Sequence, residues 1–137
     1  MILNHFSNRL HPDYYETVIE MLVVNLGFVI LRRTAHAIWL RQPGANVDAQ
    51  FVQSAEAHRD ADKRYSQMSF ISETPREDLE KLAAWAKGKG MEAVVGSYSD
   101  REFFLDAPAA FVDFIIEAMR PELADYGIDL QGNRIEA

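Results

Sequence analysis

The sequence contains no cysteine, which excludes disulfide bonds, zinc sites built on thiolates and a cysteine nucleophile. It also lacks a long apolar run, because Asn25 and Gly27 interrupt the chain just after the short apolar run at residues 21–24. No membrane-spanning helix is therefore expected. The first residues, MILNHFSNRL, carry neither a basic segment nor a long apolar one, so no signal peptide is expected. These absences favour a protein of the reducing cytoplasm.

Basic residues are also scarce. The chain has 14 Lys and Arg against 21 Asp and Glu, a net charge of -7. Nucleic-acid binding needs a basic patch, so this balance argues against a nucleic-acid partner. With 137 residues, 48% of them hydrophobic, the chain suits one compact unit with a real core. It is too short for two ordinary domains but long enough for two modules that share a core.

The clearest internal signal is a short repeat. The pattern P-x-A-x-V-D occurs at residues 43–48 and again at residues 108–113, an offset of 65. An apolar triplet precedes each copy, IWL in the first and FFL in the second. A repeat of this kind predicts two similar structural units within the chain.

Two helices of matching length are expected. Pro12 suits the first position of a helix, and Gly27 suits the left-handed conformation that ends one. The second helix begins at a capping box formed by Thr74 and Glu77, with Pro75 inside it, and ends at the glycines of the sequence GKG. Apolar residues recur at helical spacing in both segments.

Short strands flank both helices. The sequence predicts them over residues 2–10, 28–32, 35–41 and 47–53, then over 65–72 and 91–95, with a loop at 96–100 and a strand, turn and strand over 101–119. Each half then reads strand, helix, strand, strand, strand. A helix over residues 108–119 is the alternative, because Phe111, Phe114, Ile115 and Met119 also have helical spacing.

An α+β fold of two tandem βαβββ modules in one domain is therefore expected. Residues 1–54 form the first module, residues 55–64 a charged connector, and residues 65–119 the second module. A solvated helical turn within residues 55–64 is an equal alternative to a plain connector. Residues 120–137 are expected to form a tail with one helical turn before Gly127.

Two such modules in a chain of this length resemble the vicinal oxygen chelate superfamily. That superfamily includes glyoxalase I, extradiol dioxygenases, and fosfomycin- and bleomycin-resistance proteins. The resemblance covers residues 1–119 and rests on the architecture and on short patterns: NHF on the first strand, NLGF at the end of the first helix, and the two hairpins. It implies a curved mixed sheet around a cleft, with the helices outside.

The resemblance also implies a divalent-metal site in that cleft. Metalloenzymes of this kind place His, Gln or Glu on the first and last strands of each module. On this sequence the matching residues are His5, Gln50, Gln67 and Glu117. The register of the last strands is open, so Asp48 and Asp113 remain alternatives to Gln50 and Glu117. The metal itself is also open, with Zn, Ni, Mn, Mg and Fe all compatible with such ligands.

Five side chains are expected to act on a substrate. Ser7 and Ser69 share the polar faces of the two first strands, and Trp39 and Phe104 could line an apolar pocket. Glu117 is the expected catalytic residue, because a glutamate in an apolar cleft has a raised pKa and can move a proton next to a carbonyl.

Three function classes remain open from the sequence. The first is a metal-dependent lyase or isomerase of the glyoxalase type that acts on a small carbonyl compound. The second is a metal-free protein that binds a small molecule, like the bleomycin-resistance proteins. The third is a structural or regulatory interaction module. The resemblance further implies a homodimer, and it leaves open whether the modules pair within one chain or swap between two.

Overall fold

The computed structural model describes residues 1–56, 63–129 and 131–135 of the 137-residue chain. The first module contains β1 (His5–Leu10), the 3-10 helix η1 (Pro12–Tyr14), α1 (Tyr15–Leu26), β2 (Val29–Arg33), β3 (Ala37–Arg41) and β4 (Asp48–Gln53). The second contains β5 (Gln67–Ile71), α3 (Pro75–Gly88), β6 (Val94–Ser97), β7 (Glu102–Asp106) and β8 (Ile115–Met119). The predicted α+β fold of two βαβββ modules is confirmed.

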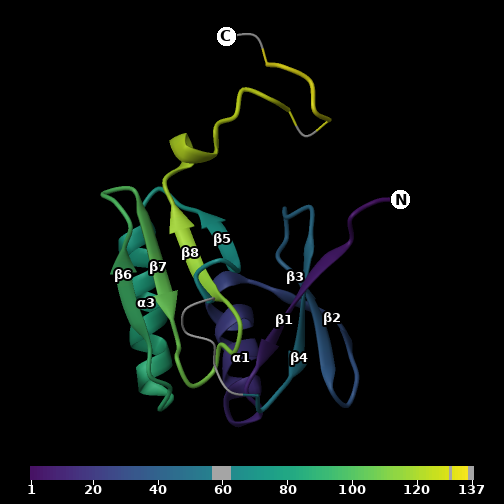
Figure 1. Cartoon of the computed structure of the whole chain (residues 1–137), viewed down its shortest axis with the longest axis vertical. Coiled ribbons are helices and arrows are strands. Elements are labelled where there is room, and N and C mark those ends of the chain that lie inside the picture. Colours follow the sequence, from purple (N-terminus) through teal and green to yellow (C-terminus); the bar gives the residue numbers. More distant parts are fainter. Residues whose placement is uncertain (57–62, 130, 136–137) are drawn as a thin grey trace.

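The two sheets have the same strand order (Figure 1). The first is ordered β1-β4-β3-β2 and the second β5-β8-β7-β6. In each, the first strand pairs in parallel with the last, and the other neighbours are antiparallel. Because β8 is a strand paired with β5, the alternative helix over residues 108–119 is wrong.

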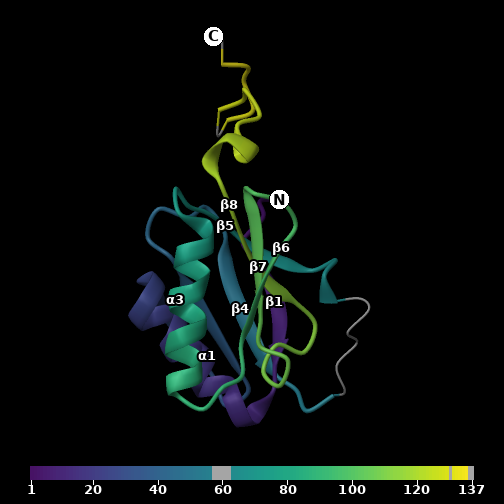
Figure 2. The same ribbon diagram turned by 90° about the vertical axis from the view of Figure 1, so that its left-hand side faces the viewer.

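Both helices lie on the same side of the molecule, as Figure 2 shows, and α1 contacts α3. Gly27 ends α1 with a φ of 70°, the left-handed conformation that glycine adopts at low cost. Pro75 opens α3 as predicted, but the predicted capping box is wrong. The Thr74 side chain caps no backbone N–H and instead donates to the Asp78 carboxylate at 3.3 Å.

One hydrophobic core joins the two modules. The segment between β7 and β8 reaches into the first module, where Phe111 forms an isolated bridge with Leu10. The rings of Phe111 and Phe114 stack with centroids 4.5 Å apart, and Phe114 lies 5.8 Å from Phe51 of β4. All three rings are fully buried. The modules therefore share a core, as the length of the chain suggested.

The β6–β7 hairpin lies further along the chain than predicted. A strand was expected over residues 91–95 and a loop over 96–100, but β6 covers Val94–Ser97. Met91 and Ala93 are buried before the strand begins. Gly96 lies within β6, opposite Phe104 of β7, where an added Cβ would come within 2.2 Å of the Phe104 ring. The Phe104 ring covers this position of the strand, so only a residue without a side chain fits there.

The repeated P-x-A-x-V-D motif does not occupy equivalent places in the two modules. Asp48 begins β4 and pairs with His5, whereas Asp113 precedes β8. Asp113 accepts hydrogen bonds from the backbone and side chain of Arg9, at 2.9 and 3.0 Å. The β7–β8 connection is two residues longer than the β3–β4 connection, and this difference separates the two aspartates.

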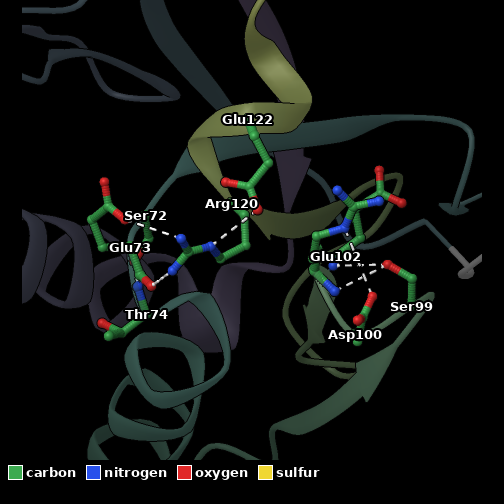
Figure 3. A network of polar contacts seen from close by, with 9 residues as sticks. Ser72, Glu73, Thr74, Ser99, Asp100, Glu102, Arg120 and Glu122 are labelled. Carbon is green, nitrogen blue, oxygen red and sulfur yellow. Dashed lines mark hydrogen bonds and ion pairs between the residues drawn. The ribbon is translucent and has the colours of Figure 1, made fainter.

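After β8, Arg120 attaches the start of the tail to the second module (Figure 3). Its guanidinium donates to the backbone oxygen of Glu73, lies 3.3 Å from the Glu73 carboxylate and donates to Glu122 at 3.3 Å. The predicted helical turn is present as the 3-10 helix η2 (Pro121–Ala124). Beyond η2 the tail extends away from the two modules (Figures 1 and 2).

Two further expectations concern the connector and the membrane. Residues 57–62 of the predicted connector lie outside the described part of the chain. Across the residues that the structure does describe, no helix is long and apolar enough to cross a membrane.

Candidate ligand-binding site

Each sheet packs one face against the core and carries polar and aromatic side chains on the other, which we call its open face. Because side chains alternate along a strand, one row of three residues crosses each open face. In the first sheet, Gln50 of β4 pairs with Ser7 of β1 and with Trp39 of β3. In the second sheet, Glu117 of β8 pairs with Ser69 of β5 and Phe104 of β7. The two rows are therefore equivalent: Ser7 corresponds to Ser69, Trp39 to Phe104, and Gln50 to Glu117.

On the open face of the first sheet, two side chains pack against the indole ring of Trp39. His5 packs edge-on against the indole, with ring centroids 6.4 Å apart, and the Arg32 guanidinium lies 5.4 Å from the ring. The Nδ1 atom of His5 is 2.8 Å from the Asn4 side-chain oxygen. The other ring nitrogen, Nε2, forms no hydrogen bond with any residue that the structure describes.

A cross-strand ion pair closes one end of this face. Arg41 of β3 donates to both carboxylate oxygens of Asp48 on β4, at 2.8 and 3.0 Å. These hydrogen bonds hold the pKa of Asp48 below its usual value. The bidentate geometry satisfies the carboxylate within the sheet, so Asp48 is better suited to a structural role than to metal binding.

The open face of the second sheet holds a buried carboxylate. Glu117 is only 8% exposed, and its Oε1 accepts a hydrogen bond of 2.8 Å from the Ser69 hydroxyl. Within residues 1–56, 63–129 and 131–135, no cationic side chain forms an ion pair with Glu117. A buried carboxylate with one neutral hydrogen bond is incompletely compensated, because burial disfavours the charge. Its second oxygen is therefore suited to a ligand.

A depression of about 590 Å³ lies over this carboxylate. It is lined by Arg64, Tyr65, Gln67, Tyr98, Glu102 and Glu117. Phe104 stands beside it, with the Tyr98 ring 5.0 Å away and the Arg64 guanidinium 5.4 Å from its centroid. We call this depression the second-sheet pocket. Its lining combines aromatic rings with the Glu117 carboxylate, which a bound ligand could reach with a hydrogen-bond donor.

Most residues of this lining were not among the site residues predicted from the sequence. Arg64 and Tyr65 come from the boundary of the expected connector, and Tyr98 comes from the expected loop after Gly96. Lys63, also assigned to the connector, is 2% exposed and forms an ion pair of 2.8 Å with Asp106 of β7. A charged run is ordinarily solvated, and nothing local in the sequence distinguishes these residues from a solvated linker.

No protein-family model and no curated protein matches this sequence. Solved structures do match the fold. A "possible glyoxalase" from Bacillus cereus is 18% identical over 87% of this chain and 98% of its own, with a TM-score of 0.58. The fosfomycin-resistance protein FosX from Mesorhizobium loti is 11% identical over 88% and 93%, with a TM-score of 0.55. TnmS3, an antibiotic-binding protein from Streptomyces, is 14% identical over 88% and 95%, with a TM-score of 0.53.

The chain has the vicinal oxygen chelate fold. The resemblance inferred from the two modules and their short patterns is thus confirmed at the level of the fold. At these identities the likeness defines the arrangement of strands and helices and leaves the activity to the side chains.

The vicinal oxygen chelate fold of this chain distributes the predicted site residues between its two sheets. The first sheet carries His5, Ser7, Trp39 and Gln50, and the second carries Gln67, Ser69, Phe104 and Glu117. Gln67 and Glu117 line the second-sheet pocket together. Among the described residues, no hydrogen bond, ion pair or ring contact joins His5 or Gln50 to that pair, and no three His, Asp or Glu side chains are grouped to hold a metal ion.

Proposed function

We propose that this protein binds a small organic molecule in the second-sheet pocket, with Glu117 as the anchor. The observation that carries the proposal is the buried Glu117 carboxylate, which is held by Ser69 and has no cationic partner among the described residues. TnmS3, described as an antibiotic-binding protein, has the same fold and supports a binding role.

The charges of the pocket indicate the class of ligand. Its lining includes two carboxylates, Glu102 and Glu117, and one guanidinium, Arg64, so negative charge is in excess. Tyr98 and Phe104 offer ring faces beside the carboxylate. A flat ligand with a cationic or strongly donating group would therefore place its ring on the aromatics and its donors on the free oxygen of Glu117.

Benzamidine is a suitable probe, because its amidinium matches a carboxylate and its ring matches the aromatic wall. We expect calorimetry to show binding to the unmodified protein and about tenfold weaker binding to Glu117→Gln, a loss of roughly 1.4 kcal/mol. Glu122→Gln is the matched control, because Glu122 lies in η2 and is absent from the pocket lining. Equal affinities for Glu117→Gln and the unmodified protein would refute the assignment.

A second candidate function is a metal-dependent lyase or isomerase that acts on a small carbonyl compound. The observation in its favour is that each predicted ligand has an atom with no hydrogen-bond partner among the described residues: Nε2 of His5 and a side-chain oxygen of Gln50, Gln67 and Glu117. One nitrogen and three oxygens are donors that divalent metals accept. Bound there, a divalent cation would polarise a substrate carbonyl, and Glu117 would take the proton from the adjacent carbon.

The four ligands belong to two sheets, so this candidate function depends on how the sheets are brought together. We propose a homodimer, as the family resemblance implies. Within it, we propose that the first sheet of one chain faces the second sheet of its partner, because this arrangement would bring the four ligands together. Light scattering that gives the mass of one chain would refute the dimer. For the metal, His5→Ala and Glu117→Gln should each lower the Ni²⁺ or Zn²⁺ bound after dialysis; unchanged binding in both would leave the metal-free function.

A further inference from the structure

A second cavity, of about 290 Å³, lies between the two modules. Its lining comprises Phe6, Asn8, Phe28, Gln42, Ala45, Val47, Asp48, Ala49, Gln67, Met68, Ser69 and Phe70. Phe6 pairs with Ala49, and by alternation both point to the face of the first sheet opposite His5 and Gln50. We call this cavity the seam pocket. It is separate from the second-sheet pocket, although Gln67 contributes to both.

Aromatic and aliphatic side chains form most of the seam pocket. Phe28, which follows α1, meets Phe70 of β5 edge-to-face, with ring centroids 6.2 Å apart. Phe6 of β1 is 64% exposed and provides a further ring at the wall of the pocket. Such walls favour a flat apolar ligand, and a cavity of this size admits a fragment rather than a drug-sized molecule.

Two glutamines give the pocket a defined hydrogen-bonding character. The amide nitrogen of Gln42 donates to the backbone oxygen of Leu26 at 3.1 Å, and that of Gln67 donates to the backbone oxygen of Arg64 at 3.1 Å. A backbone carbonyl can only accept, so each amide must present its nitrogen to the protein. The side-chain oxygen of each glutamine accepts no hydrogen bond from any described residue. The pocket therefore offers two side-chain oxygens as acceptors, and the protein already uses one of the two N–H groups of each amide.

The charge of the pocket is neutral. Asp48 is the one ionisable residue in its lining, and Arg41 occupies both oxygens of that carboxylate. A charged ligand would meet no free opposite charge among these residues and would lose its hydration. The lining thus favours a neutral ligand, and the oxygens of Gln42 and Gln67 can accept a hydrogen bond from it.

We propose that the seam pocket binds a small neutral aromatic molecule that carries an N–H donor, with the ring packed against the wall formed by Phe28 and Phe70 and the donor on the side-chain oxygen of Gln42. Indole serves as the probe. 1-Methylindole is its matched partner, because the methyl group removes the donor and keeps the ring. This site does not depend on the function proposed for the second-sheet pocket.

The test is a titration of the ¹⁵N-labelled full-length protein followed by NMR. Indole should shift the backbone amides of Phe6, Phe28 and Phe70, and 1-methylindole should bind about fivefold more weakly, because one hydrogen bond is lost. Equal affinity for the two compounds would overturn the proposal. Shifts confined to Tyr98 and Glu102, which line the second-sheet pocket, would also overturn it.

Variants locate the donor contact. Gln42→Met keeps the length of the side chain and removes the acceptor, so it should reduce the preference for indole from about fivefold to none. Gln53→Met on β4 is the control, since Gln53 is not part of the seam lining, and it should keep the full preference. Ala49→Leu should weaken both compounds at least fivefold by filling the cavity. A preference that survives Gln42→Met, or affinities that survive Ala49→Leu, would contradict the assignment.

Discussion

The open faces of the two sheets share a backbone plan and differ in how their charges are satisfied. At one position of the plan, the first sheet has Arg41 on β3, which pairs with Asp48 on the neighbouring strand. At the equivalent position the second sheet has Asp106 on β7, and its cation, Lys63, comes from the segment before β5. The neighbouring strand offers Ile115 where the first sheet has Asp48.

This difference changes the burial of the charges. Arg41 is 53% exposed in its pair, whereas Lys63 is 2% exposed in its pair. In the first pair the cation is therefore in reach of water, whereas in the second pair the cation is buried. The same backbone arrangement accommodates both ion pairs, because Arg41 comes from the sheet itself and Lys63 comes from the segment before β5.

The largest expected effect separates the two ion pairs. Asp106→Ala leaves the Lys63 ammonium buried without its partner, so we expect a loss of about 3 kcal/mol of unfolding free energy. Asp48→Ala leaves Arg41 at a position where water can solvate it, so we expect a loss of less than about 1 kcal/mol. Urea denaturation of the two variants measures both values.

Similar losses in the two variants would show that Lys63 reaches water when Asp106 is removed. Lys63→Met, which removes the buried charge, is the informative companion. Its stability should exceed that of Asp106→Ala, because only a partly exposed carboxylate is left unpaired.

An intermediate effect is expected at Gly96, which the Phe104 ring covers in the second sheet. Gly96→Ala places a methyl group within 2.2 Å of that ring, so the ring must move, at a cost of about 1–2 kcal/mol. The double variant Gly96→Ala, Phe104→Leu should recover part of the loss in thermal unfolding. Gly88→Ala is the control, because a methyl group added there would meet no atom within 4 Å and the residue is helical; it should leave stability unchanged or slightly raised.

If Gly96→Ala and Gly88→Ala were equally stable, the Phe104 ring could move away from residue 96 at no cost. In that case the aromatic wall of the second-sheet pocket would not be fixed by the glycine beneath it. The affinity for benzamidine in Gly96→Ala would then match that of the unmodified protein.

The smallest expected effect is the pH dependence of the first sheet. Arg41 lowers the pKa of folded Asp48, so the ionised carboxylate stabilises the fold above the unfolded pKa, about 3.9. That contribution is lost as the pH falls through the lower folded-state pKa. The stability difference between the unmodified protein and Asp48→Asn should be constant from about pH 7 to pH 5 and shrink below about pH 4.

Chemical denaturation at a series of pH values checks this dependence. Parallel curves for the two proteins down to strong acid would mean that Asp48 is ionised with equal ease in the folded and unfolded chains. The pair with Arg41 would then contribute nothing to folding.

The sequence by itself determined the order of elements. The prolines at the helix starts, Gly27 at a helix end and the alternation along the strands depend on neighbours in the chain, and they predicted both βαβββ modules. Alternation also placed Ser7, Gln50, Ser69 and Glu117 on the cleft-facing sides of their strands. The strand pairing then aligned Trp39 with Gln50 and Phe104 with Glu117. The P-x-A-x-V-D alignment failed by two residues because a connection between strands can lengthen without disturbing either strand.

Only the tertiary structure decided which of these side chains are enclosed and what they meet. Ser69 donates a hydrogen bond to Glu117, which is 48 residues away in the sequence, and Lys63 pairs with Asp106, which is 43 residues away. The seam pocket depends likewise on β5 lying beside the first module. Burial and pairing of this kind arise from contacts between distant segments, and no local pattern in the sequence records them.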